Sequence, residues 1–147
     1  MSVNENFRTT ILSAFTLRGR GVHGGEHCSA RLQPAQTGTG ICINGTRLHP
    51  QGLVSRPLCT GFQTETGLVL TVEHLLAAIY GLQIDDLHIE ITGGEVPILD
   101  GSAQPWVERM IPKNQIGQRA TLDLKSPIEI QDGAKWVRAV PWGELHL

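Results

Sequence analysis

Two stretches of the chain alternate apolar and polar side chains, which is the pattern of a strand with one buried face. They are residues 26–32 and residues 86–92. Their alternate apolar positions are expected to face the core, namely Cys28, Ala30, Leu32, Leu87, Ile89 and Ile91. Shorter apolar runs bounded by glycine, proline or polar residues predict further strands within 8–17 and at 41–43, 58–62, 68–70, 120–124, 127–131, 135–140 and 144–147. The chain is therefore expected to be rich in short strands.

Residues 72–82 follow a different period, with apolar side chains every three or four positions, as on one face of an amphipathic helix. That buried stripe would consist of Val72, Leu75, Leu76, Ile79 and Leu82. Thr71 is expected to cap the start of the helix, because its hydroxyl can accept a hydrogen bond from a first-turn amide. Gly81 suits the helix end. Together with the small residues Ala77 and Ala78, it would let a ligand or a partner surface come close.

A second helix is expected after Ser102, which can cap it, with Pro105 in its first turn and Pro112 at its end. Tight turns such as the Asn-Gly pair at 44–45 favour antiparallel strand pairing, whereas residues 46–57 are interpreted as irregular. The predicted fold class is α+β, with a mostly antiparallel sheet and two helices packed on one face in two layers. Residues 1–147 are expected to form a single domain.

Composition narrows the class of protein without naming its chemistry. A hydrophobic content of 40% and a charged content of 18% are typical of a globular domain. A formal net charge of −2 argues against nucleic acid as a partner, and no apolar run is long enough for a transmembrane segment. The polar N-terminus is not a secretory signal. Three cysteines without a CxxC pair favour a reducing compartment, so we expect a cytoplasmic protein.

Glu73 and His74 are the candidate chemical groups, because they stand side by side in the first turn of the predicted helix, away from its apolar stripe. An imidazole can bind a metal ion that acidifies water, and a carboxylate can take the proton of that water. The alternative is a solvated first turn in which the helix dipole alone favours Glu73. The pair by itself favours the solvated first turn, because adjacent Glu-His pairs occur by chance in many helices.

Several segments in one order resemble the N-terminal domain of UDP-3-O-acyl-N-acetylglucosamine deacetylase, the zinc amidohydrolase of lipid A biosynthesis. They are TVEHLLAA at 71–78, GLQIDD at 81–86 and EVPILDGSA at 95–103, preceded by GVHG at 21–24 and LCT at 58–60. The resemblance runs from about residue 8 to the end of the chain. It implies hydrolysis of the N-acetyl group of a UDP-acyl-glucosamine substrate with a zinc cofactor.

The resemblance also implies roles for individual residues. Glu73 would be the general base and His74 a zinc ligand, since they stand at the matching positions of the family's TVEH motif. Segments that flank the family's active site would place four further side chains near the substrate, namely His23, Leu58, Cys59 and Thr60. Asp100 receives no catalytic role. Glu95 is either a charged site residue or, as its place after two glycines favours, a turn residue.

In the family, two further zinc ligands belong to a second domain, in an HKxxxD-type helix that has no counterpart here. Catalytic zinc sites usually hold three protein ligands and a water, so one histidine leaves the site incomplete. The remaining histidines are interpreted as structural or solvent-exposed rather than as replacement ligands, namely His27, His49, His88 and His146. The expected second domain is therefore absent, and the isolated chain is not expected to be active alone.

Two functions stay open at this point, beside a third reading in which the chain is a stable but inert structural relic. The chain is either half of a deacetylase, completed by a second domain, another copy or a full-length deacetylase, or a catalytically dead single-domain relative. The latter would bind a nucleotide-sugar or another protein. Glu73→Ala and His74→Ala would abolish the first function and leave the second unchanged.

Overall fold

The computed structural model describes residues 7–119 and 124–141. Its largest sheet has the strand order β2-β3-β9-β4-β5. These strands are β2 (Phe15–Arg20), β3 (His27–Pro34), β4 (Ile41–Ile43), β5 (Thr46–Arg47) and β9 (Leu87–Thr92). All neighbours in this sheet are antiparallel except β4 and β9, which run parallel. The predicted α+β class with mostly antiparallel pairing is confirmed.

The pairing of β3 with β9 confirms the two alternating patterns. Ala30 lies opposite Ile91, and Leu32 lies opposite Ile89, so apolar residues of both strands share one face. These side chains are buried, whereas His88 on the other face of β9 is exposed. The buried face of β9 is therefore its apolar face.

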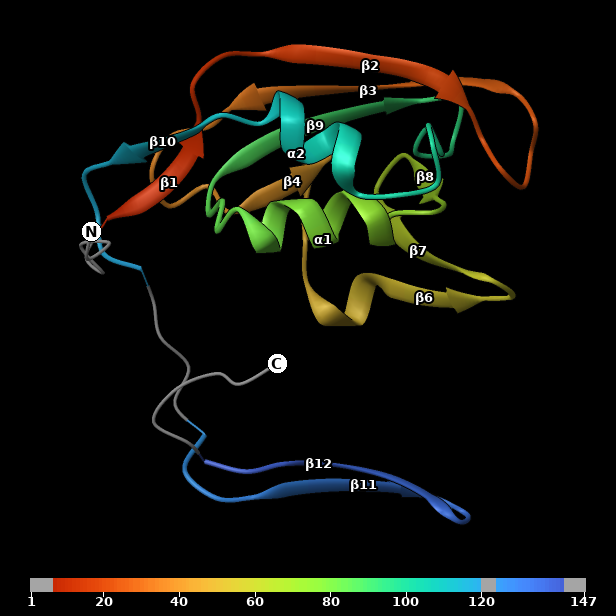
Figure 1. Cartoon of the computed structure of the whole chain (residues 1–147), viewed down its shortest axis with the longest axis vertical. Coiled ribbons are helices and arrows are strands. Elements are labelled where there is room, and N and C mark those ends of the chain that lie inside the picture. The colour runs from red at the N-terminus through yellow and green to blue at the C-terminus, as the bar shows by residue number, and fades with distance from the viewer. Residues whose placement is uncertain (1–6, 120–123, 142–147) are drawn as a thin grey trace.

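That face is covered by helix α1 (Glu73–Gly81) and helix α2 (Gln104–Arg109). The two helices contact each other, and Figure 1 shows α2 beside the sheet with α1 below it. Leu75 and Ile79 of α1 and Trp106 of α2 join the same buried cluster as the strand residues. At about 1.5–3 kcal/mol per buried Leu or Ile, this stripe holds α1 on the sheet.

The helix ends differ in detail from the sequence predictions. Ser102 lies one residue before the N-cap of α2, which is Ala103, although the Ser102 hydroxyl does accept a hydrogen bond from the Gln104 amide at 3.1 Å. Ala78, predicted on the open side of α1, is buried, whereas Ala77 and Gly81 are exposed. The apolar stripe of α1 is thus wider than the spacing alone indicated.

A three-stranded antiparallel sheet leads into α1. It consists of β6 (Leu53–Arg56), β7 (Cys59–Thr64) and β8 (Gly67–Val69). The prediction that residues 46–57 are irregular was wrong in part, because this segment contains β5, the short helix η1 (Pro50–Gly52) and β6. The polar turn predicted before β8 and the Asn-Gly hairpin between β4 and β5 are confirmed.

The segment 8–17 contains two strands rather than one. β1 (Arg8–Ile11) pairs with β10 (Pro112–Gln115), and β2 continues through Gly19 to Arg20. β10 was not predicted, because it begins with a proline and its three other residues are polar. Its partner is about 100 residues away in the sequence, so only the folded chain reveals the pairing.

Strands β11 (Ile128–Asp132) and β12 (Lys135–Ala139) form a hairpin of exposed residues, which Figure 1 shows apart from the helices. They confirm the strands predicted at 127–131 and 135–140. The strand predicted at 144–147 and residues 120–123 of that predicted at 120–124 lie outside the described residues. No helix in the described part of the chain is long and apolar enough to cross a membrane.

Candidate functional site

Helix α1 begins without a side-chain cap, contrary to the prediction for Thr71. The N-cap is Val72, and no side chain bonds to the first-turn amides there. Thr71 adopts a left-handed backbone conformation with φ of 59°, and its hydroxyl donates instead to Oε1 of Glu95 at 2.8 Å. The Val72 amide donates to the Thr60 carbonyl at 3.1 Å, which fixes the helix start against strand β7.

Glu73 lies in the first turn of α1 and faces the beginning of β7. Its Oε2 accepts a hydrogen bond from the Thr60 amide at 2.9 Å. The side chain is half-buried, and within residues 7–119 and 124–141 no ion pair engages Glu73 or His74. The carboxylate is thus held at one oxygen, while its Oε1 accepts no hydrogen bond from the described groups.

His74 is half-buried beside Glu73 and lies near Asp100 in the turn before α2. The pKa of Asp100 is lowered, first by hydrogen bonds from the amide and hydroxyl of Ser102 and further by the charge of His74. Asp100 is therefore an anion in the surroundings of His74 that the sequence analysis did not assign to the site.

A pocket of about 410 Å³ includes in its lining Leu70, three residues before helix α1, and Cys59, the neighbour of Thr60. Its lining residues come from the β6–β7 hairpin, from β8 and the residue after it, and from the glycine-rich loop 21–25 (the His23 loop). Two basic side chains and four apolar ones line it, namely His23, Arg56, Pro57, Cys59, Leu68 and Leu70. Because the lining combines an apolar wall with two cation-forming groups, it fits a ligand that carries both an apolar and an anionic part.

Three of the four predicted substrate-side residues lie around this region. His23 and Cys59 line the pocket, and Thr60, the next residue of β7, holds Glu73 through its amide. Leu58 was predicted within a strand, which is wrong. It occupies the β6–β7 turn with φ of 63° and is 95% exposed, and it does not line the pocket.

Glu95 was interpreted from the sequence as a turn residue in preference to a charged site residue. It is only 4% exposed, so the interpretation as a simple turn residue was wrong. Besides Thr71, it binds the amides of His23 and Gly24, each at 3.1 Å. Nothing near Glu95 in the sequence indicates these partners, because they lie 24 to 72 residues earlier in the chain.

The other described histidines do not converge on Glu73. His49 accepts a hydrogen bond from the Gly52 amide at 3.1 Å through Nδ1, and its ring meets Phe62 edge to face at 5.8 Å. His27 and His88 are exposed on strands. His146 lies outside the described residues. In the described part of the chain, no three His, Cys, Asp or Glu side chains are grouped so that they could hold a metal ion.

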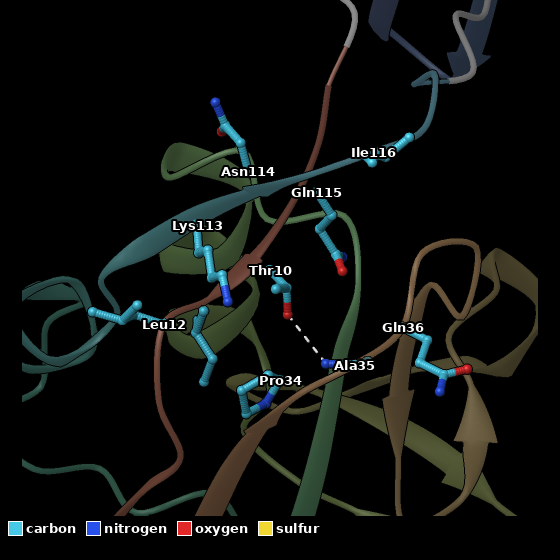
Figure 2. Close-up of a pocket in the computed structure, with 10 residues that line it drawn as sticks. Thr10, Leu12, Pro34, Ala35, Gln36, Lys113, Asn114, Gln115 and Ile116 are labelled. Carbon is cyan, nitrogen blue, oxygen red and sulfur yellow. Dashed lines mark hydrogen bonds between the residues drawn. The ribbon is translucent and has the colours of Figure 1, made fainter.

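A second pocket, of about 520 Å³, lies between β1, β10 and the end of β3, and Figure 2 shows its lining. The hydroxyl of Thr10 accepts the Ala35 amide at 3.1 Å and donates to the Asp86 carbonyl at 2.7 Å. None of the lining residues is an acid, a histidine or a cysteine. The pocket between the His23 loop and the β6–β7 hairpin is therefore the better candidate site.

The fold and this site define an α+β domain that presents an acid and an imidazole from the start of one helix, and a largely apolar pocket lined in part by the strands that lead into that helix. The family model of UDP-3-O-acyl N-acetylglycosamine deacetylase (LpxC) matches residues 8–147. The chain belongs to this family.

Curated relatives agree with the family match. The chain is 40% identical over 149 residues to UDP-3-O-acyl-N-acetylglucosamine deacetylase of Thermosynechococcus vestitus, covering 94% of this chain and 52% of the relative. It is 36% identical to the protein of the same name from Geobacter sp. strain M21 and 32% identical to that of Shewanella loihica; each match covers 92% of this chain and 48% of the relative. The chain thus spans about half the length of these relatives.

Proposed function

We propose that this chain supplies the base and one metal ligand of a site that hydrolyses the N-acetyl group of UDP-3-O-acyl-N-acetylglucosamine. One observation carries the proposal: in a member of the deacetylase family, Glu73 is fixed by the Thr60 amide at 2.9 Å beside a half-buried His74. A carboxylate held at one oxygen keeps the other available for a proton.

Glu73 would act as the general base. Water adds to the acetamide carbonyl carbon while its proton passes to the carboxylate of Glu73. The carbon–nitrogen bond then breaks, the sugar nitrogen leaves as a free amine after taking up a proton, and acetate is the second product. The Thr60 amide keeps the carboxylate oriented during both proton transfers.

A zinc ion would supply the acidity of the attacking water, but the described residues alone do not fit one. A catalytic zinc site needs three protein ligands, and the described residues contain no such group. In the proposed site, His74 is one ligand, and the others belong to the half of the relatives that this chain does not match. That half is the partner we propose, whether in the same chain, in another copy or in a full-length deacetylase. Such a protein would act in the cytoplasm.

The pocket beside the helix start is the proposed place of substrate contact. His23 and Arg56 can face anionic groups of the nucleotide-sugar, and Cys59 belongs to the apolar wall. Leu58, at 95% exposure on the hairpin tip, would contact the acyl chain. An apolar ligand group that covers this exposed side chain would bury its surface, which favours binding.

The test is a chimera that joins this chain to the remaining half of the Thermosynechococcus vestitus relative, assayed for acetate release from UDP-3-O-acyl-N-acetylglucosamine. Glu73→Gln is expected to lower kcat by about 100-fold or more, since general-base catalysis contributes about 10²–10⁴. His74→Ala should abolish zinc-dependent turnover. His88→Ala and Glu90→Gln are matched controls, because both side chains are exposed on β9, and they should leave kcat within about twofold.

A folded chimera that releases acetate equally well with Glu73→Gln would contradict the proposal. So would an equal loss of turnover in the β9 controls, because the effect would then not be specific to the site.

The second candidate is a nucleotide-sugar binding module, which the pocket favours by its lining of His23 and Arg56. Such a module would bind UDP-N-acetylglucosamine without the missing half, measured by titration calorimetry. Glu73→Ala and His74→Ala would leave that binding unchanged.

A further inference from the structure

Glu95 is a buried carboxylate whose hydrogen-bonding partners are not cationic. It accepts hydrogen bonds from the amides of His23 and Gly24 and from the hydroxyl of Thr71, at 3.1, 3.1 and 2.8 Å. In the described part of the chain no arginine or lysine forms an ion pair with it. A buried carboxylate without such a pair is expensive unless its oxygens are fully hydrogen-bonded, and these three donors provide that.

The charge of this carboxylate is retained inside the protein. Burial by itself would raise the pKa of Glu95, but the hydrogen bonds from Gly24, His23 and Thr71, with a smaller contribution from the charge of the His23 side chain, outweigh burial, and the pKa is lowered. Hydrogen bonds to an ionised acceptor are about twice as strong as neutral ones. The three contacts are therefore expected to be persistent.

The partners of Glu95 belong to both sides of the candidate site. His23 and Gly24 are in the His23 loop, which forms one wall of the pocket. Thr71 is two residues before Glu73 and adopts a left-handed conformation that directs its hydroxyl to Glu95 instead of capping α1. The backbone on either side of Glu95 bonds to Leu70, through the Gly94 carbonyl and the Val96 amide, both at 3.0 Å.

The sequence of the His23 loop is adapted to this carboxylate. A Cβ atom on Gly21 would overlap Oε2 of Glu95 and lie 2.6 Å from its Cδ, so Gly21 leaves the space that Glu95 fills. The outer side of the loop is held separately, since Arg20 donates to the Gly25 carbonyl at 2.8 Å. The loop is thus fixed from the outside by Arg20 and from the inside by Glu95.

We propose that Glu95 is a positioning residue that holds the His23 loop against the start of helix α1, so that His23 faces the same ligand as Glu73 and His74. This inference rests on the function proposed above. It assigns Glu95 no contact with the substrate: the residue acts through His23 and through Thr71.

The first measurement is amide hydrogen exchange in the full 147-residue chain, read residue by residue by NMR. Glu95→Gln keeps the shape but presents an NH2 group to one of its donors. We expect the amide of His23 or Gly24 to exchange at least about tenfold faster, because a hydrogen bond to a charged group is lost. The amides of the β3–β9 ladder should keep their exchange rates, and Glu90→Gln should change none of them.

A second test combines Gly21→Ala with Glu95→Ala and so does not depend on the orientation of a glutamine side chain at position 95. Gly21→Ala should accelerate exchange at His23 and Gly24 in the natural chain, because its Cβ meets Glu95. With Glu95→Ala already in place the nearest carboxylate atoms are gone, so Gly21→Ala should add less than about a twofold change. Equal effects in both backgrounds would show that Gly21 and Glu95 act independently and would overturn the inference.

The second measurement separates positioning from mere stability, and uses the chimera described above. Glu95→Gln should raise KM about tenfold and leave kcat within about threefold, since the affected contact is with bound substrate. An unchanged KM in an active chimera, or unchanged exchange at His23 and Gly24, overturns this inference and leaves the proposed function standing. A folded chimera without turnover overturns the proposed function, and the positioning role with it.

Discussion

The two buried carboxylates that order this domain, Asp86 and Glu95, are stabilised in opposite ways. Asp86 is fully buried and forms a two-pronged ion pair with Arg8, with N–O distances of 2.8 and 2.7 Å. It also accepts the Gly40 amide at 2.8 Å and the Gln115 amide group at 3.2 Å. The hydrogen-bond donors of Glu95 are neutral, and the His23 side chain adds a smaller electrostatic contribution.

The difference reflects what each carboxylate holds. The partners of Asp86 lie in β1, in β10 and in the loop before β4, and none of them lines the candidate pocket, so the ion pair there joins strands. The partners of Glu95 lie in a glycine-rich loop and at a helix start, both beside the pocket. The ion pair of Asp86 stabilises the scaffold, because it joins strands. The hydrogen bonds of Glu95 position a loop that lines the candidate pocket.

The largest effect is expected from breaking the scaffold carboxylate. Asp86→Asn leaves the Arg8 charge partly buried without its partner, which typically costs about 3–5 kcal/mol. The measurement is the free energy of unfolding from urea denaturation. Glu90→Gln is the control, because its pair with Arg31 spans 3.8 Å on the surface with both side chains more than half exposed, and such pairs contribute about 1 kcal/mol or less. Equal losses in the two variants would contradict the comparison.

Acidification should reduce the contributions of Asp86 and Glu95 to the free energy of unfolding. The pKa of Asp86 lies below its ordinary 3.8 and that of Glu95 below its ordinary 4.5, so the folded chain binds fewer protons than the unfolded chain. The stability that the two ionised carboxylates contribute is therefore complete at pH values above their ordinary pKa values. It is lost as the pH falls through these ordinary values towards the lower pKa values of the folded chain. The free energy of unfolding should be flat from pH 7 to about 5.5 and should fall between about pH 5 and 3. Asp86→Asn should flatten this fall, and a curve that rises on acidification would contradict the assignment.

Glu95→Gln should cost less stability than Asp86→Asn, about 1–3 kcal/mol, because one hydrogen bond to a charged acceptor is lost and no cation is left unpaired. Urea denaturation again gives the number. A loss as large as that of Asp86→Asn would mean that Glu95 belongs to the scaffold rather than to the loop.

The smallest effect is expected at the hairpin tip. Leu58→Gly removes the strain of a left-handed leucine, worth about 1–2 kcal/mol, but adds the chain entropy of glycine, about 0.5–1 kcal/mol. The free energy of unfolding should rise by about 0.5 kcal/mol, seen as a higher urea midpoint. Leu58→Ala, which keeps the strained backbone, should not show this gain. A loss of stability in Leu58→Gly would mean that the leucine side chain packs in the folded chain.

The sequence predicted those parts of the fold whose pattern is local. The alternation around Leu32 and Ile89, the Asn-Gly hairpin and the apolar period of α1 each depend on neighbouring residues, and each is confirmed. β10 was missed because its pairing with β1 depends on a distant strand. Thr71 was misassigned because its left-handed backbone and its hydrogen bond to Glu95, 24 residues later, depend on tertiary structure, and the N-cap is Val72 instead.

In the candidate site, too, features that depend on neighbouring residues could be predicted, whereas contacts between distant residues could not. Adjacent residues such as Glu73 and His74 could be singled out from the sequence, and their roles stay predictions. The contact between Glu73 and Thr60 and the partners of Glu95 arise from tertiary structure and could not be read from spacing. Glu95 gave only a weak signal, a charged residue in the apolar segment that follows two glycines.

The central claim is that this chain contributes one ligand to a metal site and does not form a complete metal site by itself. The most direct measurement is a zinc titration of the chain alone and of the chimera, each with His74→Ala and with the control His88→Ala. We predict weak binding by the chain alone. The chimera should bind zinc more than about 100-fold more tightly, and only His74→Ala should remove that gain, since even outer-shell partners are worth about 10–100-fold. Tight zinc binding by the chain alone, or a chimera whose affinity is unaffected by His74→Ala, would contradict the account.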